Sequence, residues 1–421
     1  MKIIRAEIIT IGDEILYGQI TDTNTQWISA ELDKIGIKTV RKSSVGDTEE
    51  AILSILEEAT TRADVILITG GLGPTKDDIT KKTMCKHFGM ELGINQEALE
   101  EVTRFFESRG RALTEINRQQ AFLPVGCTYI PNKLGTAPGM WFDQSDTVFI
   151  SMPGVPYEMK GMMSTTILPL LQVYFNTPTI VHRIIRTVGI GESILSETIA
   201  DWEDNLPSHI KLAYLPSMAN VKLRLTGIGA DATLLTEEIN QQINKVLPII
   251  RPFVYGYEQD ELEQVIGKLL SEKGQTLATA ESCTGGYVSH LITSVPGSSS
   301  YFVGGVVSYS NEVKNKQLGV LSETLIQFGA VSEQTIIEMA EGVRKTLSAD
   351  YGIATSGIAG PDGGTPDKPV GTVWIAVASP QRTFTRKLQL GGFRQQIIHN
   401  ATIALLNLLR KEILEEELVI V

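Results

Sequence analysis

The stretch Gln275-Thr276-Leu277-Ala278-Thr279-Ala280-Glu281-Ser282-Cys283-Thr284-Gly285-Gly286 joins two different patterns. Residues 275–280 form an apolar run typical of a strand, and residues 287–294 have the spacing of an amphipathic helix. A serine in the turn between them points its hydroxyl at the amide groups of the first helical turn. Those amides and the helix dipole can hold a developing oxyanion. We therefore interpret Ser282 as a candidate nucleophile that needs a base within reach.

A second strand end supplies a candidate base. The strand expected over residues 304–309 is followed by a helix start, and Lys314 lies about one turn into that helix. The two strand ends bring Lys314 and Tyr309 to the same edge of the sheet as Ser282. Burial lowers the pKa of a lysine because it disfavours the ammonium form. A neutral Lys314 can then accept the serine proton and return it to a leaving amine.

Each of these residues also has an ordinary structural explanation. Ser282 would act as a simple helix cap, Lys314 as a solvated helix lysine, and Tyr309 as part of the packing of the sheet. Cys283 is a rival nucleophile, although it points elsewhere than its neighbour and no histidine accompanies it in sequence. The sequence alone leaves these alternatives open.

Two further segments near the C-terminus are suited to binding an anion or an amide. The glycine-rich loop 356–366 follows a strand, so its backbone amides can bind a phosphate or an amide group; a long mobile loop is the alternative. Gly391-Gly392-Phe393-Arg394 places an arginine at the start of the last helix, where its guanidinium could bind a phosphate through two N–H groups.

The chain has 421 residues, which is too long for one hydrophobic core. Strand-like and helix-like segments alternate over residues 1–170, which predicts a mostly parallel sheet covered by helices. Residues 171–252 read as a small α+β linking domain that ends in a hinge at 251–253. Residues 253–421 form a third, α/β unit. The predicted fold class is therefore a multi-domain α/β protein.

The first unit has its own candidate site. An apolar strand at 64–69 ends in Gly70-Gly71-Leu72-Gly73-Pro74-Thr75-Lys76-Asp77-Asp78. Glycines at such a point let backbone amides approach a phosphate. The adjacent Asp77 and Asp78 would repel a bare anion, so a metal ion or a sugar hydroxyl is needed to reconcile the two. Acids that merely cap the next helix are the alternative.

Composition excludes several other classes of protein. The net charge of −12 and the pI of about 5.1 argue against coating of nucleic acid. The three cysteines are widely separated and lack metal-ligand spacing, which favours a reducing cytoplasm without disulfides. We expect no signal peptide, because the N-terminus reads directly into a strand, and no membrane association, because no apolar run approaches the length of a membrane span.

The C-terminal motifs resemble the CinA carboxy-terminal family, whose members are nicotinamide mononucleotide deamidases. The matching segments are 279–286, 307–314, 357–361 and 368–373. The resemblance implies that Ser282 is the nucleophile, Lys314 the base and Tyr309 an assisting group. It implies hydrolysis of the carboxamide of nicotinamide mononucleotide to nicotinic acid mononucleotide and ammonia, without a metal. The implied substrate-binding residues are Arg394, Thr284, Gly285, Gly286, Gly357, Ala359 and Gly360.

The N-terminal motifs are similar to the three-layer αβα molybdopterin-binding fold, and more closely to the N-terminal domain of full-length CinA proteins. These motifs are residues 12–16, 22–24, 45–47, 70–78, 135–139 and 152–159. The CinA version implies metal-dependent hydrolysis of ADP-ribose to AMP and ribose 5-phosphate. Leu72-Gly73-Pro74 departs from the Thr-Gly-Phe usual in molybdopterin binders, which disfavours a molybdenum role.

The same resemblance implies the residues of that site. The implied substrate contacts are Gly70, Gly71, Gly73, Thr75 and Gly154. The implied ligands of a divalent metal, either Co²⁺, Mg²⁺ or Mn²⁺, are Asp78, Asp77, Asp47 and Asp13.

The sequence hypothesis is a cytoplasmic, homodimeric hydrolase of pyridine nucleotide recycling. Two alternatives remain: an N-terminal domain that only binds a nucleotide or pterin as a sensor, or an interaction protein for DNA uptake or repair.

Overall fold

A computed structural model describes residues 3–75, 78–144 and 146–415 of the chain. The chain divides into two compact units. The first contains Met1–Val181 and Gly227–Thr236, and the second contains His182–Thr226 and Glu237–Val421. Each unit has its own hydrophobic cores.

The first unit is built on a six-stranded sheet in the order β2-β1-β3-β8-β7-β6. The first four of these strands are parallel to one another. At the edge, β7 pairs antiparallel with β8, and β6 pairs antiparallel with β7. A separate two-stranded ribbon pairs β4 with β5. The strands are β1 (Ile4–Ile11), β2 (Ile37–Val45), β3 (Val65–Thr69), β4 (Leu92–Ile94), β5 (Phe122–Pro124), β6 (Thr128–Ile130), β7 (Gly139–Gln144) and β8 (Thr147–Met152).

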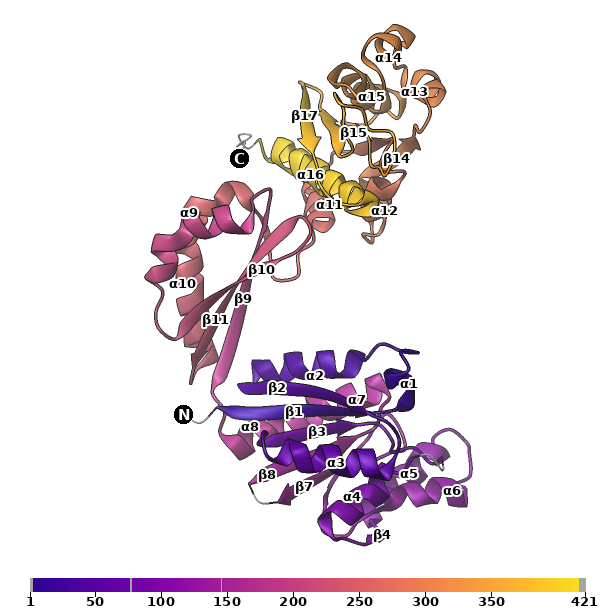
Figure 1. The fold of residues 1–421 in the computed structure, drawn as a ribbon, viewed down its shortest axis with the longest axis vertical. Coiled ribbons are helices and arrows are strands. Elements are labelled where there is room, and N and C mark those ends of the chain that lie inside the picture. The colour runs from indigo at the N-terminus through magenta and orange to yellow at the C-terminus, as the bar shows by residue number, and fades with distance from the viewer. Residues whose placement is uncertain (1–2, 76–77, 145, 416–421) are drawn as a thin grey trace. The chain divides into compact units, whose positions relative to one another are not determined.

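Helices cover both faces of this sheet (Figure 1). Side chains alternate along β1, so that Ile8 shares a core with Ile28 of α2, whereas Ile9 shares the opposite core with Ile52 of α3. The result is a three-layer arrangement. The helices are α1 (Asp13–Leu16), α2 (Thr23–Lys34), α3 (Glu49–Thr60), α4 (Thr80–Phe88), α5 (Gln96–Glu107), α6 (Glu115–Arg118), α7 (Pro156–Met162) and α8 (Leu168–Phe175), with a π-turn at Met163–Ile167 between the last two.

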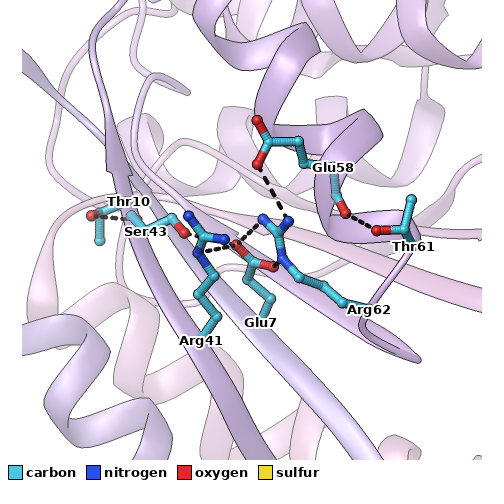
Figure 2. A network of polar contacts seen from close by, with 7 residues as sticks. All are labelled: Glu7, Thr10, Arg41, Ser43, Glu58, Thr61 and Arg62. Carbon is cyan, nitrogen blue, oxygen red and sulfur yellow. Dashed lines mark hydrogen bonds and ion pairs between the residues drawn. The ribbon is translucent and has the colours of Figure 1, made fainter.

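The first sheet contains a buried carboxylate, Glu7, that is hydrogen-bonded to side chains from neighbouring elements. Glu7 of β1 is 0% exposed and accepts hydrogen bonds from Arg62 Nε at 2.6 Å and Nη2 at 3.1 Å (Figure 2). The Ser43 hydroxyl of β2 donates to the same carboxylate at 2.7 Å. Arg62 in turn reaches Glu58 of α3 at 3.3 Å. The hydrogen bond to Glu7 is the main cause that raises the pKa of Arg62, and this network ties α3 to β1 and β2.

The middle of the chain forms a four-stranded sheet in the order β10-β11-β9-β12. Its elements are β9 (Thr179–Val188), α9 (Glu192–Asp204), β10 (Ile210–Pro216), β11 (Asn220–Gly229), α10 (Ala232–Ile250) and β12 (Val254–Tyr257). The expected hinge at 251–253 is a 3₁₀ turn, and β12 after it pairs antiparallel with β9. This sheet therefore continues past the boundary expected at residue 252.

The C-terminal sheet has five strands in the order β14-β13-β15-β16-β17. β14, β13 and β15 are parallel, whereas β16 and β17 are antiparallel. The strands are β13 (Leu277–Glu281), β14 (Phe302–Val307), β15 (Tyr351–Gly357), β16 (Thr372–Ala378) and β17 (Thr383–Gln389). The helices are α11 (Leu262–Lys273), α12 (Tyr287–Thr293), α13 (Asn311–Leu318), α14 (Ser322–Phe328), α15 (Glu333–Thr346) and α16 (Arg394–Leu414).

The two faces of this sheet carry different side chains. One core combines large residues of the strands, such as Ile353, with α11, α12 and α16. The other combines alanines of the strands, such as Ala280, with α13 and α15. Small residues are needed on that face because α15 lies close: a Cβ on Gly352 would meet the Ala340 carbonyl oxygen at 2.2 Å. This packing fixes the position of α13, which carries Lys314.

The predicted multi-domain α/β fold is confirmed, including the three-layer first unit and the strand, turn and helix around Ser282. Within the described residues, no helix combines the length and the hydrophobicity needed to cross a membrane.

Candidate functional site

Ser282 lies at the rim of the C-terminal sheet. It follows β13, which is flanked by β14 and β15, and its N–H donates to the carbonyl oxygen of Thr355 in β15 at 3.0 Å. The residue is 9% exposed. The sheet therefore holds the serine in place while leaving a small opening toward solvent.

Lys314 approaches Ser282 from the first half of α13. The residue is 1% exposed, and its Nζ lies 3.0 Å from the Ser282 Oγ. Nζ also lies 2.7 Å from the carbonyl oxygen of Ser308 and 3.5 Å from that of Tyr309. Burial, which is the largest cause, lowers the pKa of Lys314. A neutral amine has two N–H groups for the two carbonyls and one lone pair, which is then left for the serine hydroxyl.

The local sequence explains why this lysine is buried and its neighbour is not. The Ser310 side chain caps α13 by accepting from the Val313 N–H, which starts the helix directly after the strand end. Lys314 then falls on the face toward the sheet. Lys316, two residues on, lies in solvent and pairs with Glu312 at 2.6 Å. The interpretation of Lys314 as a solvated helix lysine is therefore wrong.

Tyr309 and Arg394 form an exposed edge of the unit beside Lys314. Tyr309 is 64% exposed, so it does not serve to pack the sheet. Arg394, the first residue of α16, donates from Nη2 to the Tyr309 hydroxyl at 3.2 Å and from Nη1 to the Gly360 carbonyl at 2.8 Å. The arginine thus joins α16, the loop after β15 and the end of β14. Two of its donors are already used within the protein.

The amides of the first turn of α12 are not available to an oxyanion, contrary to the expectation from the sequence. Those of Gly286, Val288 and Ser289 donate to the carboxylate of Glu281, at 3.0, 3.0 and 2.8 Å. Ser282 is also not the cap of this helix, because the N-cap residue is Gly286 and the Ser282 hydroxyl is bonded to Lys314.

The predicted substrate contacts around Ser282 are mostly engaged within the protein. The Thr284 hydroxyl lies 2.7 Å from both Glu281 and Thr355, and the Gly285 N–H donates to the Ser282 carbonyl at 3.2 Å. The amides of Cys283 and Thr284 donate to no other residue in the part of the chain that the structure describes. These two N–H groups directly follow the nucleophile in the chain and remain available.

Cys283 is not a competing nucleophile. It is 6% exposed, and burial raises the pKa of its thiol to about 12. A thiol with that pKa is protonated at neutral pH, whereas the thiolate is the reactive form.

The loop after β15 is bonded to Arg394. Gly357 ends β15, Ala359 is buried, and Gly360 has a φ of +75° with its carbonyl bound to Arg394. Of the predicted substrate contacts in this loop, Gly360 is the one tied directly to the Tyr309–Arg394 edge.

The first unit contains a cleft of about 550 Å³ at the carboxyl ends of its parallel strands. Ile11 of β1, Thr69 of β3 and Pro153 after β8 line it. Open α/β sheets bind their ligands at such ends, as the sequence predicts. The predicted contacts Gly70, Gly71, Gly73 and Gly154 also line this cleft, whereas Thr75 lies outside its lining and bonds to Asp78.

The first two glycines of the loop after β3 have no substitute. Gly70 has a φ of +116°, and a Cβ there would meet the Ile11 carbonyl oxygen at 2.1 Å. Gly71 has a φ of +63°, and its Cβ would meet the Thr80 hydroxyl at 2.1 Å. The amides of Gly71, Leu72 and Gly73 donate to no acceptor among the described residues. They form a set of N–H groups suited to phosphate oxygens.

The predicted metal ligands are only partly gathered in this cleft. Asp47 and Asp78 line it, and Asp78 accepts hydrogen bonds from the Thr75 N–H at 2.9 Å and from its hydroxyl at 2.5 Å. Asp13 stands beside Asp47, to which its N–H donates at 3.1 Å, and is not part of the lining. Asp77 lies outside the described residues. Among the residues that are described, no three His, Cys, Asp or Glu side chains form a ready metal cluster.

The sequence reasoning missed several acidic residues of the cleft. Glu14, Asp22 and Glu158 also line it, which makes five carboxylates with Asp47 and Asp78. Glu158 is 9% exposed, and one of its oxygens accepts from Asn132 Nδ2 at 2.7 Å. Its place in the motif 152–159 was the available signal. No Lys, Arg or His belongs to the lining where the structure describes the chain, which leaves out residues 76 and 77.

Comparison with known proteins covers the chain in three consecutive segments. The family models are described as "Probable molybdopterin binding domain" over residues 7–173, "Damage-inducible protein CinA KH domain" over 182–256 and "CinA C-terminal domain" over 259–413. A CinA-like protein of Cytophaga hutchinsonii is 54% identical and covers 98% of this chain and 99% of its own length. The chain belongs to the CinA family.

A second CinA-like protein gives the same family assignment. A CinA-like protein of Flavobacterium psychrophilum is 48% identical over 98% of this chain and 99% of its own length. Among solved structures, the competence/damage inducible protein CihA from Agrobacterium tumefaciens is 37% identical, covers 35% of this chain and 92% of its own, and has a TM-score of 0.35. The family resemblance seen in the sequence is confirmed, and the middle module, which the sequence showed only as a small α+β unit, matches a KH domain.

Proposed function

We propose that the C-terminal unit of this CinA-family chain hydrolyses the carboxamide of nicotinamide mononucleotide. The observation that carries the proposal is the pair formed by Ser282 and the buried Lys314, whose reacting atoms are 3.0 Å apart. The pair is suited to acyl transfer, since a neutral amine can take the proton of a hydroxyl that lies within hydrogen-bond distance.

In the first half of the reaction, Ser282 Oγ bonds to the carboxamide carbon while its proton passes to Lys314 Nζ. The carbonyl oxygen becomes an oxyanion, for which the amides of Cys283 and Thr284 are the available donors. Collapse of this intermediate breaks the C–N bond. Lys314 returns the proton to the leaving nitrogen, so that ammonia departs and an ester on Ser282 remains.

In the second half, water attacks the ester carbon and Lys314 accepts a proton from it. The bond to Ser282 Oγ breaks, Oγ regains the proton, and nicotinic acid mononucleotide leaves. Tyr309 and Arg394 contact each other at the exposed edge beside Lys314, where they can contact the ribose phosphate of the substrate.

The test is product analysis with nicotinamide mononucleotide as the substrate. The wild-type chain should release ammonia and nicotinic acid mononucleotide in equal amounts, and Ser282→Ala should release neither. Equal turnover by wild type and Ser282→Ala would reject the proposal.

A second activity is favoured by the acidic cleft of the first unit. We propose that it hydrolyses the pyrophosphate of ADP-ribose to AMP and ribose 5-phosphate with a divalent metal. Five carboxylates, and no basic side chain among the described residues, line the cleft. These carboxylates and a pyrophosphate repel each other, and a divalent cation that enters with the pyrophosphate offsets that repulsion.

The donors present fit a metal that arrives with its substrate. Asp47 and Asp78 would hold it, and the phosphate oxygens would complete its coordination; Mg²⁺ is commonly bound by one or two carboxylates plus phosphates. When bound, the metal would neutralise phosphate charge and activate water. The amides of Gly71, Leu72 and Gly73 would hold the phosphate oxygens. Incubation with ADP-ribose and a divalent ion should yield AMP; binding without AMP would leave a sensor module instead.

A further inference from the structure

Glu281, the residue before the proposed nucleophile, is an acidic group with no route to solvent. It is 1% exposed and ends strand β13. Its carboxylate accepts five hydrogen bonds. Three come from the α12 amides described above, one from the Thr284 hydroxyl at 2.7 Å and one from the Ser289 hydroxyl at 2.6 Å. A buried carboxylate persists only when its charge is satisfied in this way.

The bonds of this carboxylate span the nucleophile turn. Thr284 lies before the two glycines of the turn, and Ser289 lies in the first turn of α12. The carboxylate therefore joins both ends of residues 284–289 to the strand that precedes them. Because the amides of Gly286, Val288 and Ser289 are occupied, those of Cys283 and Thr284 are the ones left beside Ser282.

The main chain of the same residue reaches the base. The Ser308 N–H donates to the Glu281 carbonyl at 2.7 Å, and the Ser308 carbonyl in turn lies 2.7 Å from Lys314 Nζ. One residue thus contacts the turn that carries the nucleophile and the strand end that orients the lysine. Its carboxylate has no hydrogen bond to Ser282 or Lys314 among the described contacts, so it is not itself the base.

We propose that Glu281 is a positioning residue for the Ser–Lys pair. Its carboxylate holds the turn in the conformation in which the Cys283 and Thr284 amides face the oxyanion that forms on the Ser282 acyl adduct. The inference rests on the proposed amidase function only for the substrate used in its test. The contacts of Glu281 do not depend on that function. This positioning role explains why an acidic side chain is buried directly beside a nucleophile that a lysine activates.

The test compares Glu281→Gln with wild type in the full-length chain. Glutamine has nearly the same shape but offers one acceptor oxygen and two unwanted donors to five donor groups. We expect kcat for nicotinamide mononucleotide to fall about 100-fold, as displacement of a reacting group by about 1 Å does. KM should change little, and the acid limb of the pH profile should stay in place, because the Glu281 carboxylate makes no hydrogen bond to Lys314 Nζ.

A second readout does not depend on the substrate. A fluorophosphonate labels an activated serine. Its rate of labelling of Ser282 should fall in Glu281→Gln by a factor similar to the fall in kcat. Turnover is expressed per labelled site. A purely structural role would lower the melting temperature and the number of labelled sites but not the rate per site. Ser289→Ala removes one of the five donors and should show a smaller loss of the same kind, which decides the matter if Glu281→Gln does not fold.

Glu338→Gln is the matched control. Glu338 of α15 accepts from the Leu321 N–H at 2.8 Å and from the Thr324 hydroxyl at 2.7 Å, in the same unit but without contact to the turn. It should keep wild-type rates. Wild-type kcat and labelling in Glu281→Gln, or an equal loss in Glu338→Gln, would overturn the inference. If labelling is slowed in Glu281→Gln but neither wild type nor any variant releases ammonia, nicotinamide mononucleotide is rejected as the substrate and the role of Glu281 stands. If the wild type is neither labelled nor releases ammonia, both the proposed amidase function and the role of Glu281 are rejected.

Discussion

The Nζ atom of Lys314 and the Oγ atom of Ser282 lie 3.0 Å apart in the interior of the C-terminal unit, although 32 residues separate them in the chain. Two carbonyl groups face the same amine, and no hydrogen bond or ion pair joins it to a carboxylate among the described residues. This environment favours the neutral lysine, which is the form that a general base requires.

Removal of the Lys314 amine should strongly reduce amidase turnover. Lys314→Ala is expected to lower kcat by about 10²–10⁴-fold, the usual contribution of a general acid–base group. Lys316→Ala, on the exposed side of the same helix, should have no effect. Ammonia release measured for both variants checks the prediction, and equal rates would exclude Lys314 as the base.

The pH dependence should have a defined sign. Because burial lowers the pKa of Lys314, kcat/KM should rise with pH until that lowered pKa is passed and then level off below the ordinary value of 10.5. A pH–rate profile that falls over this range would contradict the assignment.

The same shift links stability to pH. Between the lowered pKa of Lys314 and 10.5 the unfolded chain binds more protons than the folded chain, so the free energy of unfolding rises with pH there. Lys314→Met removes this dependence. Its gain over wild type, measured by urea unfolding, should be largest below the lowered pKa and shrink toward pH 10.5. A constant gain would mean that the lysine is not shifted.

Arg394 should act through geometry rather than charge alone. Its two bonds, to Gly360 and to Tyr309, need the planar fork of a guanidinium. Arg394→Lys keeps the charge but not the fork, and we expect kcat/KM for nicotinamide mononucleotide to fall by about tenfold or more, equivalent to the loss of one charge-assisted hydrogen bond. Arg386→Lys on β17 serves as the control. Steady-state kinetics that show full activity in Arg394→Lys would remove the arginine from the site.

The sequence predicted the parts of the site that follow from strand ends. Ser282 and Tyr309 follow the ends of β13 and β14, and Lys314 lies in the helix that begins after β14. Parallel neighbouring strands bring residues at such ends to one edge. It could not predict what Glu281 does, because a side chain that bonds forward to residues 284–289 depends on the exact path of the turn. The available oxyanion donors were assigned to the wrong amides for the same reason.

The acidic cleft shows the same limit. The glycines after β3 line this cleft, and they can be recognised in the sequence because they directly follow an apolar strand. Glu158 enters from α7, and it fits only because residue 135 is a glycine: a Cβ there would meet the Glu158 Oε2 at 2.0 Å. A contact between a turn and a helix 23 positions apart is a matter of tertiary packing, which no local pattern contains.

The buried ion pair of the first unit should matter for stability and not for chemistry. Glu7→Gln leaves the Arg62 guanidinium without its main partner, and breaking a buried pair costs about 3–5 kcal/mol. Glu58→Gln removes the exposed partner of the same arginine and should cost less than about 1 kcal/mol. The loss of stability in each variant is measured by the hydrogen-exchange protection of the amides of β1 and β2. Ammonia release should be unchanged in each, and equal protection in the two variants would contradict the prediction.

Removal of metal should separate the two proposed activities within one chain. The cleft of the first unit offers five carboxylates and, among the described residues, no basic side chain, so a pyrophosphate needs a cation there. The Ser282–Lys314 pair uses only an amine and a hydroxyl. Treatment with EDTA should therefore stop AMP formation from ADP-ribose while ammonia release from nicotinamide mononucleotide continues. Re-addition of Mg²⁺, Mn²⁺ or Co²⁺ in turn should restore AMP formation and identify the best ion, and Asp78→Asn should prevent that restoration. AMP formation that persists after chelation would refute the metal-dependent proposal, whereas loss of both activities would show that the ion supports the amidase as well.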